Sequence, residues 1–122
     1  HITPEGIFQI SRDHSVVENM VAKGDLTPLE ARTHPNRNLI TRALGPDIHA
    51  KADTFELPWH KDEFLLLCSD GLVNTVSDQE MLFEVLHDGD VNECLDHLLQ
   101  ISLQRGAPDN ITAVLLLNEE GR

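Results

Sequence analysis

Hydrophobic and polar positions follow two different rhythms along this chain, and together they predict a mixture of strands and helices. The segments 64–69 and 111–117 are almost continuous apolar runs of strand length, a pattern typical of strands that are buried on both faces. Shorter patterns at 7–10 and 54–58 indicate two further strands, and the first residues read as the middle of a hairpin. The chain is therefore expected to contain at least one sheet.

Helical spacing fills the intervals between these strands. Apolar residues repeat at helical intervals over 16–21, and a second short helix begins at Thr27-Pro28. Capping boxes, in which a polar cap is followed three residues later by glutamate, open two longer helices at Ser77 and Asp90. The second half of the chain thus reads strand, strand, helix, helix, strand, and the helix pair is predicted to cover one face of the sheet.

On the face of the predicted sheet opposite the helix pair, no predicted element buries the apolar side chains. Both central strands are apolar on their two faces, whereas the helix pair covers one of them. We therefore expect exposed hydrophobic surface, and dimerisation or strand exchange that hides it.

Each of the two long apolar runs adjoins a lone aspartate. The first run ends at Asp70, and the second begins just after Asp109. If the two strands pair side by side and antiparallel, both carboxylates lie at the same edge of the sheet, where their mutual repulsion favours a cation between them. An all-oxygen donor set favours Mg²⁺ or Mn²⁺ over Zn²⁺. The alternative is that Asp-Gly and Pro-Asp-Asn are ordinary turn chemistry at strand ends.

Five segments, in this order, resemble motifs of the metal-dependent serine/threonine protein phosphatases, the protein phosphatase 2C family, in its bacterial branch. LCSDGL at 67–72 and PDNITAV at 108–114 are similar to the last two metal-binding motifs of the family. ISRDHS at 10–15 and THPNRNLITRALG at 33–45 are similar to segments that adjoin its helical flap, and the residues between them resemble the flap itself. The family's N-terminal motifs, R-x-x-N-E-D, D-G-x-G-G and G-D-S-R, do not occur. The resemblance implies that residues 1–122 are the C-terminal portion of a single catalytic domain, with the flap at about 16–45.

The resemblance also implies a fold and a set of site residues. The expected fold is α+β, part of a four-layer α/β/β/α sandwich with antiparallel sheets and a helical flap. Asp70 and Asp109 match ligands of a binuclear Mn²⁺ or Mg²⁺ centre. Asn38 matches a position that in some bacterial members helps to hold a third ion, and loop capping is its alternative role. Arg37 and Arg42 are expected to form structural ion pairs with the abundant carboxylates, and no further catalytic residue is assigned.

The implied function is hydrolysis of phosphoserine and phosphothreonine on proteins by a metal-activated water, within a larger catalytic domain. The partners would be phosphorylated proteins that a cognate serine/threonine kinase has modified. The chain alone is expected to be inactive or impaired, because the aspartate that bridges both metals belongs to the D-G-x-G-G motif. A rival interpretation is a non-catalytic regulatory or interaction module that retains the phosphatase-like scaffold.

Charge and composition limit the binding partners and the cellular compartment that are expected for this chain. The formal net charge is −12, and no lysine or arginine occurs between Asp62 and Gln104, which argues against electrostatic binding of nucleic acid or anionic lipid. No apolar run approaches the roughly 20 residues that span a bilayer. Cys68 and Cys94 lie within apolar patterns and are predicted to be buried thiols, which fits a reducing, cytoplasmic compartment.

Overall fold

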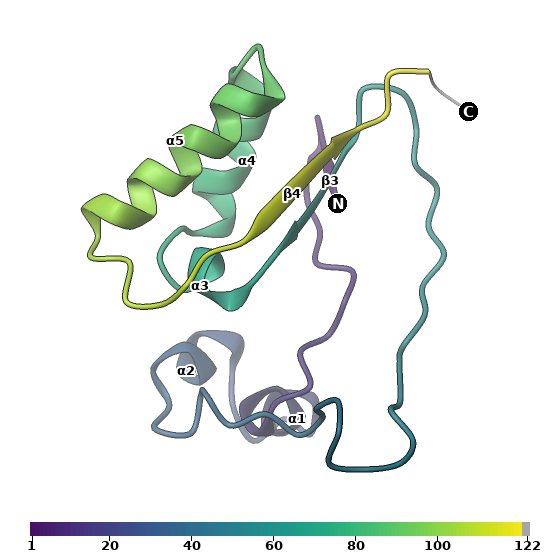
Figure 1. The fold of residues 1–122 in the computed structure, drawn as a ribbon, viewed down its shortest axis with the longest axis vertical. Helices are drawn as coiled ribbons and strands as arrows, with labels where there is room; N and C mark the ends of the chain where they lie inside the picture. The colour runs from purple at the N-terminus through teal and green to yellow at the C-terminus, as the bar shows by residue number, and fades with distance from the viewer. Residues whose placement is uncertain (121–122) are drawn as a thin grey trace. The chain divides into compact units, whose positions relative to one another are not determined.

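The computed structural model describes residues 1–120, which fall into two compact units (Figure 1). One unit combines His1–Gln9 with the chain from Leu57 onward, and the other comprises Ile10–Glu56. The elements, in chain order, are β1 (Ile2–Thr3), β2 (Gly6–Ile7), α1 (Val16–Ala22), α2 (Pro28–Thr33), β3 (Phe64–Cys68), α3 (Asp70–Val73), α4 (Asp78–His87), α5 (Val91–Gln104) and β4 (Ala113–Leu117). The predicted α+β class is confirmed.

The first unit is built on a four-stranded antiparallel sheet with the strand order β2-β1-β3-β4. β1 and β2 form the hairpin that the opening residues predict, and Ile2 pairs with Phe64 of β3. β3 and β4 pair along their whole length, from Phe64 opposite Leu117 to Cys68 opposite Ala113. Because the two strands are antiparallel, the end of β3 lies beside the start of β4.

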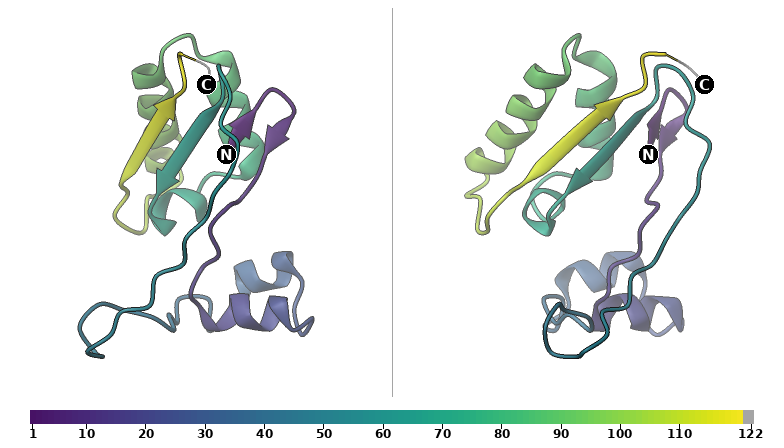
Figure 2. Two further views of the ribbon diagram at one scale, coloured as in Figure 1. Left: turned by 90° about the vertical axis from the view of Figure 1, so that its right-hand side faces the viewer. Right: turned by 45° about the vertical axis from the view of Figure 1, so that its right-hand side comes forward.

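Helices α4 and α5 lie against one face of this sheet (Figure 2). Ser77 and Glu80 form the predicted capping box at the start of α4, whereas Asp90 caps α5 alone, by accepting the N–H of Asn92 at 2.8 Å. The core of this unit consists of Ile2, Leu72, Val76, Met81, Val85, Cys94 and Leu98. Burial of each large apolar side chain in such a core contributes about 1.5–3 kcal/mol, so this layer stabilises the unit.

The opposite face of the β3–β4 pair carries exposed apolar side chains. Leu67 is 56% exposed, Val114 is 50% exposed and Leu116 is 42% exposed, and Leu67 pairs directly with Val114. The prediction that both strands are buried on two faces is therefore wrong for this chain, because side chains alternate across a sheet and the helices cover one side. The expected exposed hydrophobic surface is confirmed, and dimerisation through it stays a prediction.

Three further predictions are corrected by the structure. The strand expected at 7–10 ends at Ile7, and the described chain forms no strand at 54–58. A short alternating pattern becomes a strand where a partner satisfies its backbone groups, and sequence alternation alone does not supply that partner. Cys94 is buried as predicted, but Cys68 is exposed because it ends β3 at the sheet edge.

The second unit holds the two short helices of the expected flap. Ser15 caps α1 by accepting the N–H of Glu18, and Thr27 forms a capping box with Glu30 at the start of α2, where the sequence predicts that a helix begins. Arg42 pairs with Asp53 at 3.0 Å, so its predicted structural ion pair is confirmed. Among the described residues of both units, no helix has the length and apolar character that crossing a bilayer requires.

Candidate metal site

The end of β3 and the start of β4 are joined by contacts on both sides of Ser69. The Ser69 N–H donates to the Thr112 carbonyl at 2.9 Å, and the Ser69 hydroxyl accepts the Thr112 N–H at 3.0 Å. The same hydroxyl lies 3.4 Å from the Asn110 carbonyl oxygen, to which it donates. These bonds extend the strand pairing past Cys68 and tie the residues before Asp70 to those after Asp109.

Gly71 brings the two segments into direct contact. A Cβ atom placed on Gly71 would lie 2.2 Å from the Asn110 carbonyl oxygen and 3.1 Å from the Ile111 Cγ1. A glycine is therefore required here by close approach of two backbones, although its conformation is an ordinary helical one. Asp70 and Asp109 are each one residue away from this contact, so the predicted meeting of the two strand ends is observed.

Local structure orients each carboxylate. Asp70 is the first residue of the short helix α3, which the sequence analysis did not predict, and Ser69 occupies the N-cap position. Asp109 lies in an exposed bend, where its Oδ1 accepts the N–H of Asn110 at 2.7 Å. The Asn110 backbone thus steadies Asp109. Both carboxylates are exposed to solvent, where a cation can reach them.

The approach to Asp109 is a tight turn at the end of α5. Gly106 and Ala107 have φ values of 95° and 33°, and the Ala107 N–H donates to the Ser102 carbonyl at 2.9 Å. Such a left-handed turn satisfies a helix-terminal carbonyl and reverses the chain. The turn therefore directs the 107–112 segment back toward the end of β3.

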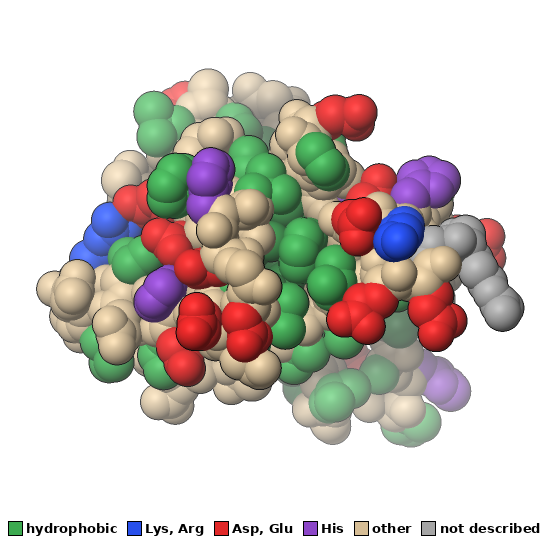
Figure 3. Space-filling view, turned by 90° about the horizontal axis from the view of Figure 1, so that it is seen from above, with side chains coloured by type: hydrophobic (Ala, Val, Ile, Leu, Met, Phe, Trp, Pro, Cys, Tyr) green, Lys and Arg blue, Asp and Glu red, His purple; other side chains and the backbone are tan. Residues whose placement is uncertain are grey.

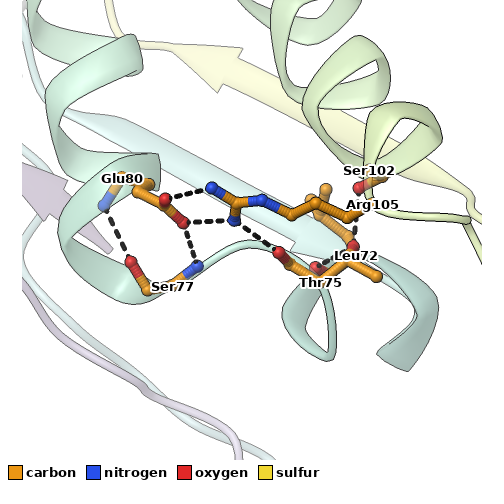
Figure 4. A network of polar contacts seen from close by, with 6 residues as sticks. All are labelled: Leu72, Thr75, Ser77, Glu80, Ser102 and Arg105. Atoms are coloured by element: carbon orange, nitrogen blue, oxygen red, sulfur yellow. Dashed lines mark hydrogen bonds and ion pairs between the residues drawn. The ribbon is translucent and has the colours of Figure 1, made fainter.

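A polar network connects this turn with α3 and α4 (Figure 4). Arg105 donates to the Thr75 carbonyl at 2.7 Å and to the Glu80 carboxylate at 2.8 Å. The Thr75 hydroxyl bonds the fully buried Ser102 hydroxyl at 2.7 Å. The end of α5, from which the chain runs to Asp109, is thereby fastened to the segment that follows Asp70.

The Arg105 guanidinium, together with the Ser77 N–H, lowers the pKa of Glu80 from 4.5 to about 2. A carboxyl whose pKa is lower in the folded chain adds stability above pH 4.5, and that stability is lost as the pH falls from 4.5 through about 2. We expect Glu80→Gln to destabilise the chain at neutral pH, and the difference from the parent to shrink as the pH falls through this window. Urea unfolding of both chains at several pH values measures this difference in the free energy of unfolding.

The matched control for this prediction is Asp96→Asn, which removes an exposed carboxylate from α5. It is expected to leave the pH dependence of unfolding nearly unchanged. Equal behaviour of the two variants would mean that the Glu80–Arg105 pair is not a special contributor to acid stability.

The chemistry of the two strand ends fits a hard divalent cation. The two strand ends present the exposed carboxylates of Asp70 and Asp109, and carboxylate oxygen is the ligand type that such a cation prefers. Asn38 lies in an exposed turn after α2, in the second unit, and its participation in a third metal site stays a prediction. Ser69, Gly71 and Arg105 are positioning residues that the sequence analysis missed.

Comparison with known proteins gives consistent matches to one kind of enzyme. No family model matches the chain. The serine/threonine phosphatase Stp of Listeria monocytogenes is 35% identical over 117 residues, which make up 93% of this chain and 46% of that protein. The protein phosphatase PhpP of Streptococcus pneumoniae is 35% identical over 120 residues, 98% of this chain and 49% of that protein. The chain thus spans about half the length of the curated relatives it matches.

Solved structures give the same picture. Serine/threonine phosphatase Stp1 from Staphylococcus aureus superposes with a TM-score of 0.87 at 38% identity, over 98% of this chain and 47% of that one. The catalytic domain of the phosphatase PstP in complex with two manganese ions superposes with a TM-score of 0.75 at 34% identity, over 93% of this chain and 46% of that one. The fold of this chain is therefore the fold of about half of such a domain.

Proposed function

We propose that this chain, which is similar over almost its whole length to about half of several bacterial serine/threonine phosphatases, forms the C-terminal half of a catalytic domain that hydrolyses phosphoserine and phosphothreonine on proteins. The observation that carries the proposal is the junction at Ser69 and Gly71, which brings two aspartate-bearing strand ends together. Oxygen ligands at one sheet edge are what a divalent metal centre for phosphoryl chemistry requires.

Asp70 and Asp109 are the proposed metal ligands, and Asn38 is proposed to help hold a third ion. When bound, Mn²⁺ or Mg²⁺ would lower the pKa of a water molecule and supply the nucleophile for hydrolysis. This chain's contribution is to hold the two carboxylates in place: the Asn110 N–H orients Asp109, and the Ser69 bonds fix the start of α3. The manganese complex of the homologous PstP domain supports the choice of metal.

The proposed substrates are phosphorylated proteins, the products of a cognate serine/threonine kinase. Residues 16–45 are proposed to act as the flap that shapes their access, since this stretch lies within the compact unit Ile10–Glu56 and contains two capped helices. The proposed compartment is the cytoplasm, which suits the buried, unoxidised thiol of Cys94.

The experiment that tests the proposal is a calorimetric titration of the chain with Mn²⁺, beside Asp70→Asn and Asp109→Asn. Each substitution removes one charged oxygen ligand while keeping the shape of the side chain. We expect each to weaken Mn²⁺ binding by about 10–100-fold, the range typical for losing a group that supports a metal site. Hydrolysis of a phosphothreonine peptide by a chain extended upstream should fall in the same two variants.

Asp78→Asn is the matched control, because it removes an exposed carboxylate near the start of α4 that lies outside the junction. It should bind Mn²⁺ as the parent does. If all three variants lost the same amount of Mn²⁺ affinity, the loss would reflect only the lower negative charge of the chain and not the removal of a specific ligand. If Asp70→Asn and Asp109→Asn bound Mn²⁺ as tightly as the parent chain, the two aspartates would not be metal ligands, and the proposed mechanism would be wrong.

A further inference from the structure

A second group of metal-ligating side chains lies away from the junction, where the end of α4 meets α5. Glu84 lies in the last turn of α4, Asp88 is the residue that caps the end of that helix, and His97 reaches both from α5. The His97 Nδ1 lies 2.9 Å from the Asp88 Oδ2 and 3.6 Å from the Glu84 Oε2. The ligand atoms of all three residues fall within 4.8 Å of one another.

These side chains border a hollow of about 340 Å³ between the two helices. Figure 3 shows histidine and acidic side chains gathered beside hydrophobic ones on the face seen from above. Glu84 and Asp88 are only partly exposed, with side-chain exposures of 22% and 17%, so the helices hold them in place. His87 also borders the hollow, where its ring stacks on Phe83 with centroids 4.2 Å apart. The group is thus partly pre-formed and open to solvent on one side.

We propose that Glu84, Asp88 and His97 bind one Zn²⁺ ion, which links α4 to α5. One imidazole nitrogen with two carboxylate oxygens is a donor set that suits Zn²⁺, and three protein ligands with an open position is a recurrent zinc arrangement. The all-oxygen junction at Asp70 and Asp109 suits Mn²⁺ or Mg²⁺ instead. The two sites are therefore separable by metal as well as by position, and the zinc site does not depend on the proposed phosphatase activity.

Charge balance favours a dication over the simple ion pair. An imidazolium neutralises one of the two carboxylates that face it, whereas Zn²⁺ with a neutral imidazole neutralises both. The charged or titratable groups that face His97 are Glu84, Asp88, Glu93 and, across the hollow, His87. The hydrogen bond to Asp88 raises the pKa of His97, so a proton competes with the metal. Zinc binding should accordingly be tighter near pH 8 than near pH 6.

The test is a calorimetric Zn²⁺ titration of the whole chain carrying Asp70→Asn, so that the junction does not contribute. One Zn²⁺ per chain is expected, with a rise in the unfolding temperature, because a ligand that binds the native state stabilises it. Adding His97→Ala or Asp88→Asn should weaken binding by about 10-fold or more. Circular dichroism establishes whether each variant is folded. If His97→Ala does not fold, Asp88→Asn, which keeps the shape of the side chain, provides the test.

Glu93→Gln is the charge-matched control. It removes one negative charge that acts on His97 without removing a proposed ligand. Its effect on Zn²⁺ affinity should be at most about threefold, because solvent screens an exposed charge. The proposal is overturned if the chain binds no Zn²⁺, if folded His97→Ala or Asp88→Asn binds it as tightly as the parent, or if Glu93→Gln loses as much affinity as they do.

Discussion

Gly71→Ala is expected to destabilise the chain by about 3 kcal/mol, at the upper end of the cost of forcing extra volume into a packed contact. The new Cβ would lie 2.2 Å from the Asn110 carbonyl oxygen, a backbone atom that no side-chain rotation can move away. Relief requires the strand ends to separate, which would break the Ser69–Thr112 bonds and part Asp70 from Asp109. Urea unfolding measures the free energy, and a Mn²⁺ titration should show metal binding lost together with it.

Gly89→Ala supplies the matched control in the same fold. Gly89 lies between α4 and α5, and a Cβ atom there would meet nothing within 4 Å. Substitution of a glycine at an unstrained, open position changes stability by about 0.4–1 kcal/mol in the favourable direction. If Gly71→Ala proved as harmless as Gly89→Ala, the close approach of the two strand ends would not be what holds the aspartates together.

Local signals in the sequence predicted α1, α2, α4 and α5, because the interactions that start and end these helices join residues close together in the chain. The caps at Ser15, Thr27 and Ser77 each satisfy backbone N–H groups within three residues, so their pattern is readable without knowing the fold. The two central strands were also predictable, because continuous apolar runs of strand length are typical of strands in a protein core. The strand expected at 54–58 failed for the opposite reason: a strand depends on a distant partner, and alternation over five residues does not specify one.

The candidate site likewise has parts that the sequence predicts and parts that it does not. The placement of Asp70 and Asp109 at one sheet edge follows from a single assumption, antiparallel pairing of the two apolar runs, and the register confirms that pairing. The parts that hold the site were not predictable. Arg105 reaches Thr75 and Glu80 across two helix ends, and no local pattern marks an arginine for such a role. The burial of both strands was overestimated, since a continuous apolar run does not reveal whether the second cover belongs to the same chain.

Leu72→Ala is the other substitution with a large expected effect, a loss of about 2–5 kcal/mol, as for other buried leucines replaced by alanine. Leu72 is 1% exposed and belongs to the core, and it anchors α3 directly behind Gly71 and Asp70. Urea unfolding should show the loss, and Mn²⁺ binding should weaken because α3 is held less firmly. Leu103→Ala, at a position 59% exposed on α5, is the control and should cost no more than about 0.5 kcal/mol. Similar costs for the two variants would mean that α3 is not fixed by its buried side chain, and that the Ser69 bonds alone position Asp70.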